Sequence, residues 1–453
     1  ADPYQAKTLT ALLASPLATL KQLALTILED ESQILVSVWA EPLNAQITQA
    51  TPFQLFSYAV AIVAALVIML SVVFLREPDP PNEPGGASRL SGDFWVRQFL
   101  ILGVVAVLLG PVPAWITGRQ VVFDFHSDRY AMPAMFGAAL LCSGVINWLA
   151  QRRVQVGVLA GVLVGLSVIL HLRVANDYRW LWKGEQDFFW ELSWRAPGLQ
   201  APTALFLLDE PFPNQGLFST SAALNLLYPQ PEGWGAPALP GQPAGTRNLA
   251  YWIYTIRPRY NHAPDSYDFA LATQFRTLRF SGSAPEDTLV VQRNLSHGSC
   301  LWVLSSRDSK NPYVPELTRA FLPISNLNRI LPEAQQAGYP PTSLIGADPG
   351  QPWCYYFESA DLARQTQNWS RAAQLYDAAR AKGFSMEKSG SESPYEWLPF
   401  VEGLARSGRV QDAVALSRAI DQKDPAFQPM LCDLWSAGDL EPSAAMRQEL
   451  SCA

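Results

Sequence analysis

A chain of 453 residues is long enough for two or three domains. Hydrophobic residues make up 49% of it and charged residues only 16%, against roughly 25% charged in an average soluble protein. The net charge is −7 and no basic run occurs, which argues against nucleic acid as a partner. Charged residues are scarce in the first 172 positions, so we expect a membrane part followed by an ordinary, mildly acidic soluble part.

The leading segment, residues 1–52, carries one helical pattern of apolar residues. It consists of Leu17, Leu20, Leu23, Ala24, Ile27 and Leu28, and the acidic run Glu29-Asp30-Glu31 follows it. The pattern predicts an amphipathic helix, either on the outer membrane surface or packed against other spans. The chain begins Ala1-Asp2-Pro3 without the features of a signal peptide. We therefore interpret it as the C-terminal part of a longer protein.

Four apolar stretches reach the roughly 17–25 residues that a bilayer span needs. They are residues 53–75, 99–117, 130–150 and 154–172; none contains Asp, Glu, Lys or Arg, and His171 near the end of the last is their only histidine. Four such stretches in close succession would be very unusual inside a soluble core. The sequence therefore predicts about four transmembrane helices in the region 53–172.

The short loops between these spans differ in basic residues. Residues 76–97 and 151–153 together contain Arg76, Arg89, Arg97, Arg152 and Arg153, whereas residues 118–129 contain only Arg119 and Arg129. Because cytoplasmic loops are enriched in Lys and Arg, we expect the first two loops inside the cell. Residues 1–52, 118–129 and everything after 173 are then extracytoplasmic, and the protein is integral to the plasma membrane.

Residues 173–198 follow the last span and are rich in aromatic residues. Such residues either mark the headgroup layer of the membrane or form a helix that docks the soluble domain onto the spans. Both interpretations stay open from the sequence, and Ala196-Pro197-Gly198 ends the predicted helix.

Residues 199–352 have the alternation of a mixed α/β domain. A helix is predicted at 219–228, and strands are predicted at 203–208, 249–256, 269–280, 288–292 and 300–304. Because several of these strands follow one another directly, the pattern favours an antiparallel sheet.

Residues 353–453 are helical in pattern and resemble tetratricopeptide repeats. Ala372, Leu375 and Ala378 recur 41 positions later as Ala413, Leu416 and Ala419, which places small residues where paired helices touch. The resemblance implies a helical repeat array that can bind a protein partner. Two units are too few to be stable alone, so we expect the array to lean on the α/β domain.

The cysteines and histidines form no metal-binding pattern, and no cofactor is indicated. Cys142 lies in a predicted span. Outside the spans, Cys300 can pair with Cys354 and Cys432 with Cys452, and the spacing is compatible with either redox setting.

The segment Phe123-Asp124-Phe125-His126-Ser127-Asp128-Arg129-Tyr130-Ala131-Met132-Pro133 enters the third span from an outer loop. It resembles the Arg-Tyr-x-x-Pro segment of membrane-embedded (C-type) glycosyltransferases, including the protein O-mannosyltransferase group. Some of those enzymes also carry C-terminal tetratricopeptide repeats.

The resemblance implies that Arg129, with His126, Asp128 and Tyr130 beside it, contacts a polyprenyl-phosphate sugar donor. An arginine suits that role because its forked cation matches a phosphate. The alternative is that Arg129 is an interfacial anchor paired with Asp124 or Asp128.

Enzymes of this kind carry their catalytic acid in the first outer loop, and residues 1–52 contain no matching motif, so the catalytic residue is not identified. The leading hypothesis is the C-terminal part of a glycosyltransferase-like membrane protein that uses a lipid-linked sugar outside the cytoplasm. The alternative is a non-catalytic membrane-anchored scaffold that binds a protein or an envelope polymer through its external domain and repeats.

Overall fold

The structure is a computed structural model, and the chain divides into two compact units, Ala1–Trp180 and Leu181–Ala453. We call them the N-terminal and the C-terminal unit and describe each by itself. The residues that the structure describes are 6–43, 52–75, 88–122, 128–150, 152–207, 212, 216–228, 246–256, 268–293, 300–333, 340–386, 393–436 and 452.

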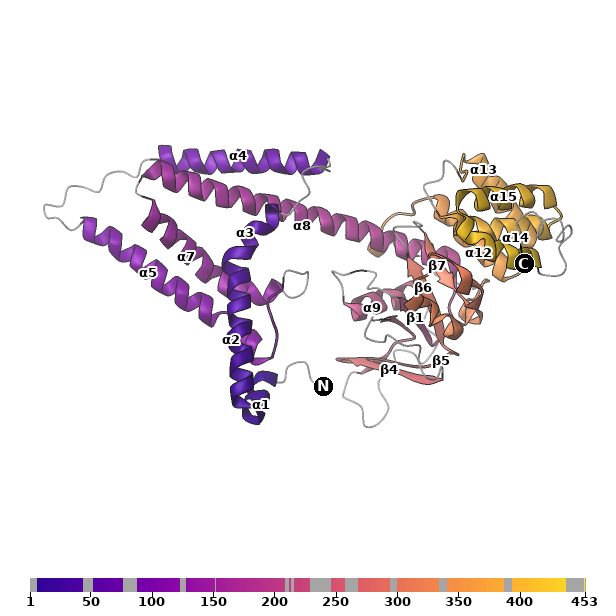
Figure 1. Cartoon of the computed structure of the whole chain (residues 1–453), viewed down its shortest axis with the longest axis horizontal. Coiled ribbons are helices and arrows are strands. Elements are labelled where there is room, and N and C mark those ends of the chain that lie inside the picture. Colours follow the sequence, from indigo (N-terminus) through magenta and orange to yellow (C-terminus); the bar gives the residue numbers. More distant parts are fainter. Residues whose placement is uncertain are drawn as a thin grey trace. The chain divides into compact units, whose positions relative to one another are not determined.

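The described secondary-structure elements of the N-terminal unit are all helical (Figure 1). Its elements are α1 (Lys7–Ala14), α2 (Pro16–Ser32), the π-helical turn η1 (Gln33–Ser37), α3 (Val38–Ala40), η2 (Glu41–Leu43), α4 (Pro52–Phe74), α5 (Ser88–Leu109), α6 (Val112–Ile116), η4 (Asp128–Ala131), α7 (Met132–Leu149) and the first part of α8 (Arg153–Arg195).

Within the described ranges, four helical stretches are long and apolar enough to cross a membrane, which confirms that prediction. They are Pro52–Phe74, Phe94–Ile116, Asp128–Leu149 and Arg153–Arg195. The fourth is much longer than residues 154–172, because the aromatic segment after it continues the same helix. The amphipathic pattern of residues 17–28 forms α2, and most of its leucines are exposed.

Glycines bring the backbones of these long helices into contact. A Cβ atom at Gly137 of α7 would lie 2.6 Å from the backbone nitrogen of Val107 in α5, and one at Gly161 of α8 would lie 2.7 Å from the carbonyl oxygen of Ala65 in α4. In Figure 1, α5 runs beside α7 and α4 beside α8. Small residues stabilise helix pairs in membranes because they let the two backbones approach closely, which increases the van der Waals contact between the helices.

We expect Gly137→Ala to lower the stability of the purified protein by about 1–3 kcal/mol, since a methyl group there overpacks the α5–α7 contact. The measurement is the thermal unfolding midpoint in detergent. Gly165→Ala is the matched control, because a Cβ there would meet its nearest atom at 3.4 Å, an ordinary contact. Equal midpoints for the two variants would contradict the close packing of α5 on α7.

The C-terminal unit is built around two small sheets. Its strands are β1 (Thr203–Leu207), β2 (Arg247–Asn248), β3 (Tyr251–Thr255), β4 (Phe269–Phe275), β5 (Leu278–Ala284), β6 (Thr288–Arg293) and β7 (Leu301–Leu304). The first sheet has the order β3-β1-β6-β7 and the second the order β2-β5-β4. The strand predicted at 269–280 is a hairpin instead, with its turn at Arg276, whose φ is +52°.

The expected antiparallel sheet is wrong for the first sheet, in which β1 pairs in parallel with both β3 and β6. The reason is α9 (Leu217–Leu227), which lies between β1 and β3 in the chain and provides the crossover that parallel strands require. Asn225 of α9 fixes this crossover: its side chain accepts from the backbone of Ala250 and Tyr251 and donates to the carbonyl of Tyr251.

Both faces of the first sheet are covered, so β1 is buried along its whole length. Leu205 and Leu207 face one core, which the end of α8 supplies with Phe188, Phe189 and Leu192. The aromatic segment after the last span is thus divided: Trp180 and Trp182 are exposed, whereas these phenylalanines are core residues of the C-terminal unit.

The other face of the first sheet packs against the C-terminal helices. These are α12 (Trp353–Gln365), α13 (Trp369–Ala381), α14 (Leu398–Arg406), α15 (Val410–Lys423) and α16 (Gln428–Ser436), which follow the short elements η5 (Ser306–Lys310), α10 (Glu316–Arg319), η6 (Leu322–Ile324), η7 (Leu327–Arg329) and α11 (Thr342–Ile345). Ala204 and Phe206 of β1 share one continuous core with these helices. The C-terminal helices therefore pack against the first sheet and share a core with it.

Two disulfide bonds cross-link this unit. Cys300 pairs with Cys354, which ties the start of β7 to α12, and Cys432 of α16 pairs with Cys452. Both pairings that the sequence permitted are formed.

Candidate functional site

Three of the residues singled out from the sequence as a phosphate site lie together at the start of α7. Asp128, Arg129 and Tyr130 form η4, the short turn that leads into this helix. Asp128 and Arg129 are exposed and Tyr130 is half-buried. His126 lies outside the described residues.

A second arginine, Arg119, joins them. The guanidinium carbons of Arg119 and Arg129 lie 5.2 and 5.3 Å from the centre of the Tyr130 ring, within the range of cation–π contact. Both arginines also donate to the Tyr130 hydroxyl, Arg129 at 3.4 Å. Two guanidinium groups are therefore held on the ring of one residue.

The position of Arg119 is set by contacts between its loop and α2. The indole of Trp115, four residues earlier in α6, is buried and donates to the Asp30 carboxylate at 2.8 Å. Gln120 donates to the Thr26 hydroxyl at 3.3 Å. The helix predicted as amphipathic thus holds the arginine-bearing loop.

Two acids at the end of α2 are withdrawn from water. Asp30 is 1% exposed, and burial raises its pKa although the hydrogen bond from Trp115 opposes the shift. Both carboxyl oxygens of Glu31 are shielded and have no hydrogen-bond partner among the described residues. Burial, helped by the neighbouring Asp30 charge, raises the pKa of Glu31 to about 7. Glu31 can therefore both accept and release a proton near neutral pH.

An apolar cavity of about 450 Å³ opens next to these groups. It begins at η1, the π-helical turn directly after α2, and continues between α7 and α8. Ile34, Val121 and Ala131 line its near end together with Asp128 of η4, so the cavity and the arginine-bearing loop share residues and direct neighbours. π-Helical turns occur often at functional sites.

The site contains groups that sequence reasoning missed. In the sequence, Arg119 bears only on the side of the membrane to which its loop is assigned, although its place in the same loop as Arg129 is a usable signal. No motif accompanies Asp30 and Glu31. The cavity has no sequence signal, because its lining comes from six separate elements, η1, α3, η2, η4, α7 and α8, and from the loop residue Val121.

No family model, curated protein or solved structure matches this chain. The argument about function therefore depends on its own residues. Within the described ranges, no group of three or more His, Cys, Asp or Glu side chains is arranged to hold a metal ion.

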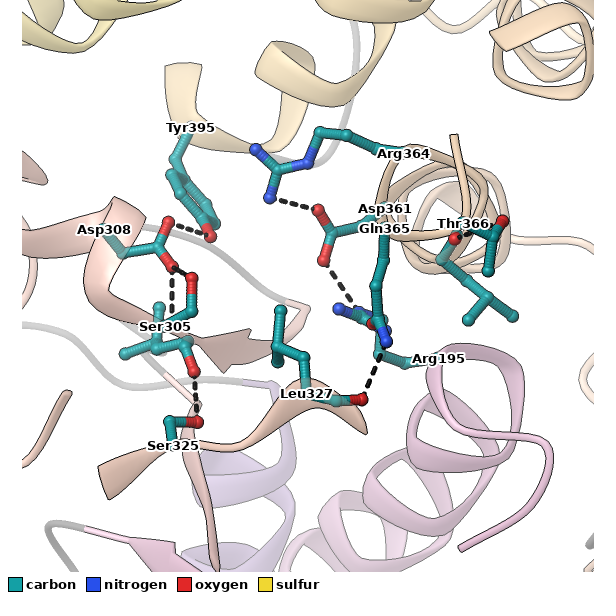
Figure 2. Close-up of polar contacts among 12 residues, drawn as sticks. Arg195, Ser305, Asp308, Ser325, Leu327, Asp361, Arg364, Gln365, Thr366 and Tyr395 are labelled. Atoms are coloured by element: carbon teal, nitrogen blue, oxygen red, sulfur yellow. Dashed lines mark hydrogen bonds and ion pairs between the residues drawn. The ribbon is translucent and has the colours of Figure 1, made fainter. Parts of the chain in front are cut away.

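A second polar cluster lies inside the C-terminal unit (Figure 2). The Nε atom of Arg195, in the last turn of α8, is 2.7 Å from one carboxyl oxygen of Asp361 in α12, and Arg364 is 2.6 Å from the other. Gln365 accepts from Arg195 and donates to the carbonyl of Leu327. Asp308 accepts from the Tyr395 hydroxyl nearby. Arg195 and Asp361 are 1% and 2% exposed, so this pair serves the fold.

Next to this cluster, Glu358 is buried, and neither of its carboxyl oxygens has a hydrogen-bond partner among the described residues. Burial, together with the charge of Glu191, raises its pKa well above the usual value, and Arg195 only partly opposes the shift. Glu358 therefore stays protonated in the folded protein at a pH where the unfolded chain has lost the proton.

This shift predicts how stability depends on pH. Above about pH 4.5 the folded state binds more protons than the unfolded chain, so stability falls as pH rises, by at most about 1.4 kcal/mol per pH unit for this group. Glu358→Gln should remove this slope and raise the unfolding midpoint at pH 8 while changing it little at pH 5. Glu316→Gln, at an exposed carboxyl, is the control. A Glu358→Gln profile parallel to that of the wild type would show that Glu358 is charged in the folded state.

Proposed function

We propose that the protein transfers a sugar from a polyprenyl-phosphate donor to an acceptor outside the cytoplasm. The observation that carries this proposal is the pair of guanidinium groups on Tyr130 beside an apolar cavity. Such a pair suits a ligand that is anionic at one end and hydrocarbon at the other.

The phosphate of the donor binds between Arg119 and Arg129. A phosphate can accept forked, charge-assisted hydrogen bonds from both guanidinium groups. The adjoining isoprenoid units enter the cavity, whose lining is almost entirely apolar. The Tyr130 ring supports this arrangement because it already holds both cations near one point.

Glu31 is the proton acceptor in this scheme. It adjoins Asp30, which Trp115 ties to the loop with Arg119, and it lies three residues before Ile34 of the cavity. The acceptor hydroxyl loses its proton to the Glu31 carboxylate while its oxygen bonds to the anomeric carbon of the sugar. The bond from that carbon to the phosphate oxygen breaks, and the lipid phosphate leaves with its electron pair, stabilised by the two arginines. A carboxyl group with a pKa of about 7 suits proton transfer at neutral pH.

The arginines should decide the affinity for lipid phosphate. We expect Arg119→Ala and Arg129→Ala each to weaken binding of undecaprenyl phosphate about 10- to 100-fold, because a charge-assisted hydrogen bond contributes about 1.5–3 kcal/mol. The measurement is native mass spectrometry of the protein in nanodiscs. Arg153→Ala, at an exposed arginine at the start of α8, is the control. Wild-type affinity in both loop variants would refute the phosphate site.

We further propose that the C-terminal unit is extracytoplasmic, as the distribution of arginines predicts, and that its helices are a tetratricopeptide-like array. The two disulfides support this side of the membrane, because such bonds persist in oxidising compartments and are rare in the cytosol. The buried Ala372 and Ala413, 41 positions apart on α13 and α15, support the repeat. Ala378 is exposed and Ala419 half-buried, so the prediction that this second alanine pair lies at a helix contact is wrong for Ala378.

A labelling experiment tests the orientation. In intact cells, a membrane-impermeant maleimide should label the Cys432–Cys452 pair only after an impermeant reductant has opened it. In a cysteine-free background, Arg152→Cys should stay unlabelled until the cells are broken, because its loop is predicted to be cytoplasmic. The reverse pattern would overturn the proposed orientation.

The scaffold remains a second candidate, favoured by a groove of about 770 Å³ on the C-terminal helices. Apolar Phe384 and Leu416 line it together with the basic Arg380 and Lys423, which suits an acidic peptide with apolar side chains. A scaffold needs this groove and not the membrane site. If Arg380→Ala abolishes the protein's cellular role while Arg129→Ala preserves it, the scaffold is the better account.

A further inference from the structure

A second large cavity, of about 810 Å³, lies in the C-terminal unit and belongs neither to the membrane site nor to the peptide groove. It is formed by the turn between α12 and α13, the end of α14, η5 and the segment after η7. We propose that this cavity is a binding subsite for an acidic glycan and that it binds a sugar unit that carries a carboxylate. This proposal is independent of sugar transfer by the membrane unit.

The charge of the lining favours an anion. Among the described residues, three arginines, Arg307, Arg364 and Arg406, line the cavity together with one carboxylate, Glu402. Glu402 lies 3.2 Å from Arg406 and compensates that cation. Arg307 is exposed at the cavity edge.

The arginine on the cavity floor is held rigidly. Arg364 shares the Asp361 carboxylate with Arg195, so two cations face one fixed anion (Figure 2). Burial alone would lower the pKa of Arg364, but the charge of Asp361, with smaller contributions from Tyr395, Asp308 and Glu402, raises it. Arg364 is therefore a fixed cation at the cavity floor, held by a network that an incoming ligand does not need to reorganise.

The remaining lining suits a sugar ring better than a bare anion. Trp369 is half-exposed, and the guanidinium of Arg406 lies 5.1 Å from its ring centre. This contact holds the indole in place in the cavity wall. The C–H face of a pyranose packs on such a ring. The amides of Asn328 and Gln367, both exposed, lie at the same cavity and can bond to sugar hydroxyl groups.

The backbone of Gln367 supports a role for its side chain. Its φ is +57°, a left-handed conformation that favours glycine. The corresponding turn 41 residues later, between α14 and α15, has glycine in this place, Gly408, with φ +87°. Glycine would adopt this φ in the first turn without strain, yet the position carries glutamine. The strain is therefore consistent with a role for the Gln367 side-chain amide at the cavity.

The experiment measures binding to the full-length protein in detergent by isothermal titration calorimetry. The probes are tri-galacturonic acid, neutral maltotriose and inorganic phosphate. We expect the acidic trisaccharide to bind at least 10-fold more tightly than either other probe, and added salt to weaken its binding. Arg307→Ala and Trp369→Ala should each lower the affinity at least 5-fold.

Matched variants separate a binding defect from a folding defect. Lys310→Ala removes a cation from the same short helix as Arg307, but one that pairs with Asp433 outside the cavity, so it should bind normally. Gln367→Gly should raise the unfolding temperature and weaken binding, which a purely structural role would not produce. Equal affinity for maltotriose, tighter binding of phosphate alone, or unchanged affinity in both Arg307→Ala and Trp369→Ala would each overturn the proposal.

Discussion

The buried ion pair between Arg195 and Asp361 is the contact on which the C-terminal unit depends. Taking two charges out of water is costly, and the cost is offset only when the remaining hydrogen-bonding groups also find partners. Here Gln365 and Arg364 complete the pair. The last turn of α8 is thereby fixed against α12, while the preceding turns of α8 supply Phe188 and Phe189 to the core on the other face of the first sheet. One helix end therefore connects the sheet with the helices that follow it.

In the N-terminal unit, a single hydrogen bond has a comparable role. The bond from Trp115 to Asp30 joins α6 to α2, and it places the loop with Arg119 beside the turn that carries Arg129. The same contact buries Asp30, the neighbour of Glu31 in the chain. The proposed phosphate site and the proposed proton acceptor therefore adjoin one packing contact. This explains why a helix that looked merely amphipathic in the sequence takes part in the site.

The sequence predicted those features that depend on local pattern. The four spans follow from uninterrupted apolar length, and most strands of the C-terminal unit follow from short runs of apolar and β-branched residues. It did not predict the parallel pairing of β1 with β3, because strand direction depends on how α9 packs after the chain has turned back. For the same reason, the sequence did not group Arg119 and Glu31 with Arg129 in one site. That grouping depends on the contacts of Trp115, which the spacing of these residues along the chain does not reveal. Glu358 was missed because a buried carboxyl group has no sequence pattern.

The central claim is that the anionic end of a polyprenyl phosphate lies between Arg119 and Arg129 with its hydrocarbon in the adjoining cavity. Photo-crosslinking tests this most directly, with an undecaprenyl phosphate analogue that carries a diazirine on its first isoprene unit and mass spectrometry to locate the adduct. The account predicts adducts on η1 and on the first turns of α7, at residues such as Ile34 and Met135 that line the cavity, and their loss when unlabelled undecaprenyl phosphate competes. Adducts spread over the lipid-facing surfaces of α4 and α5, with no competition, would contradict it.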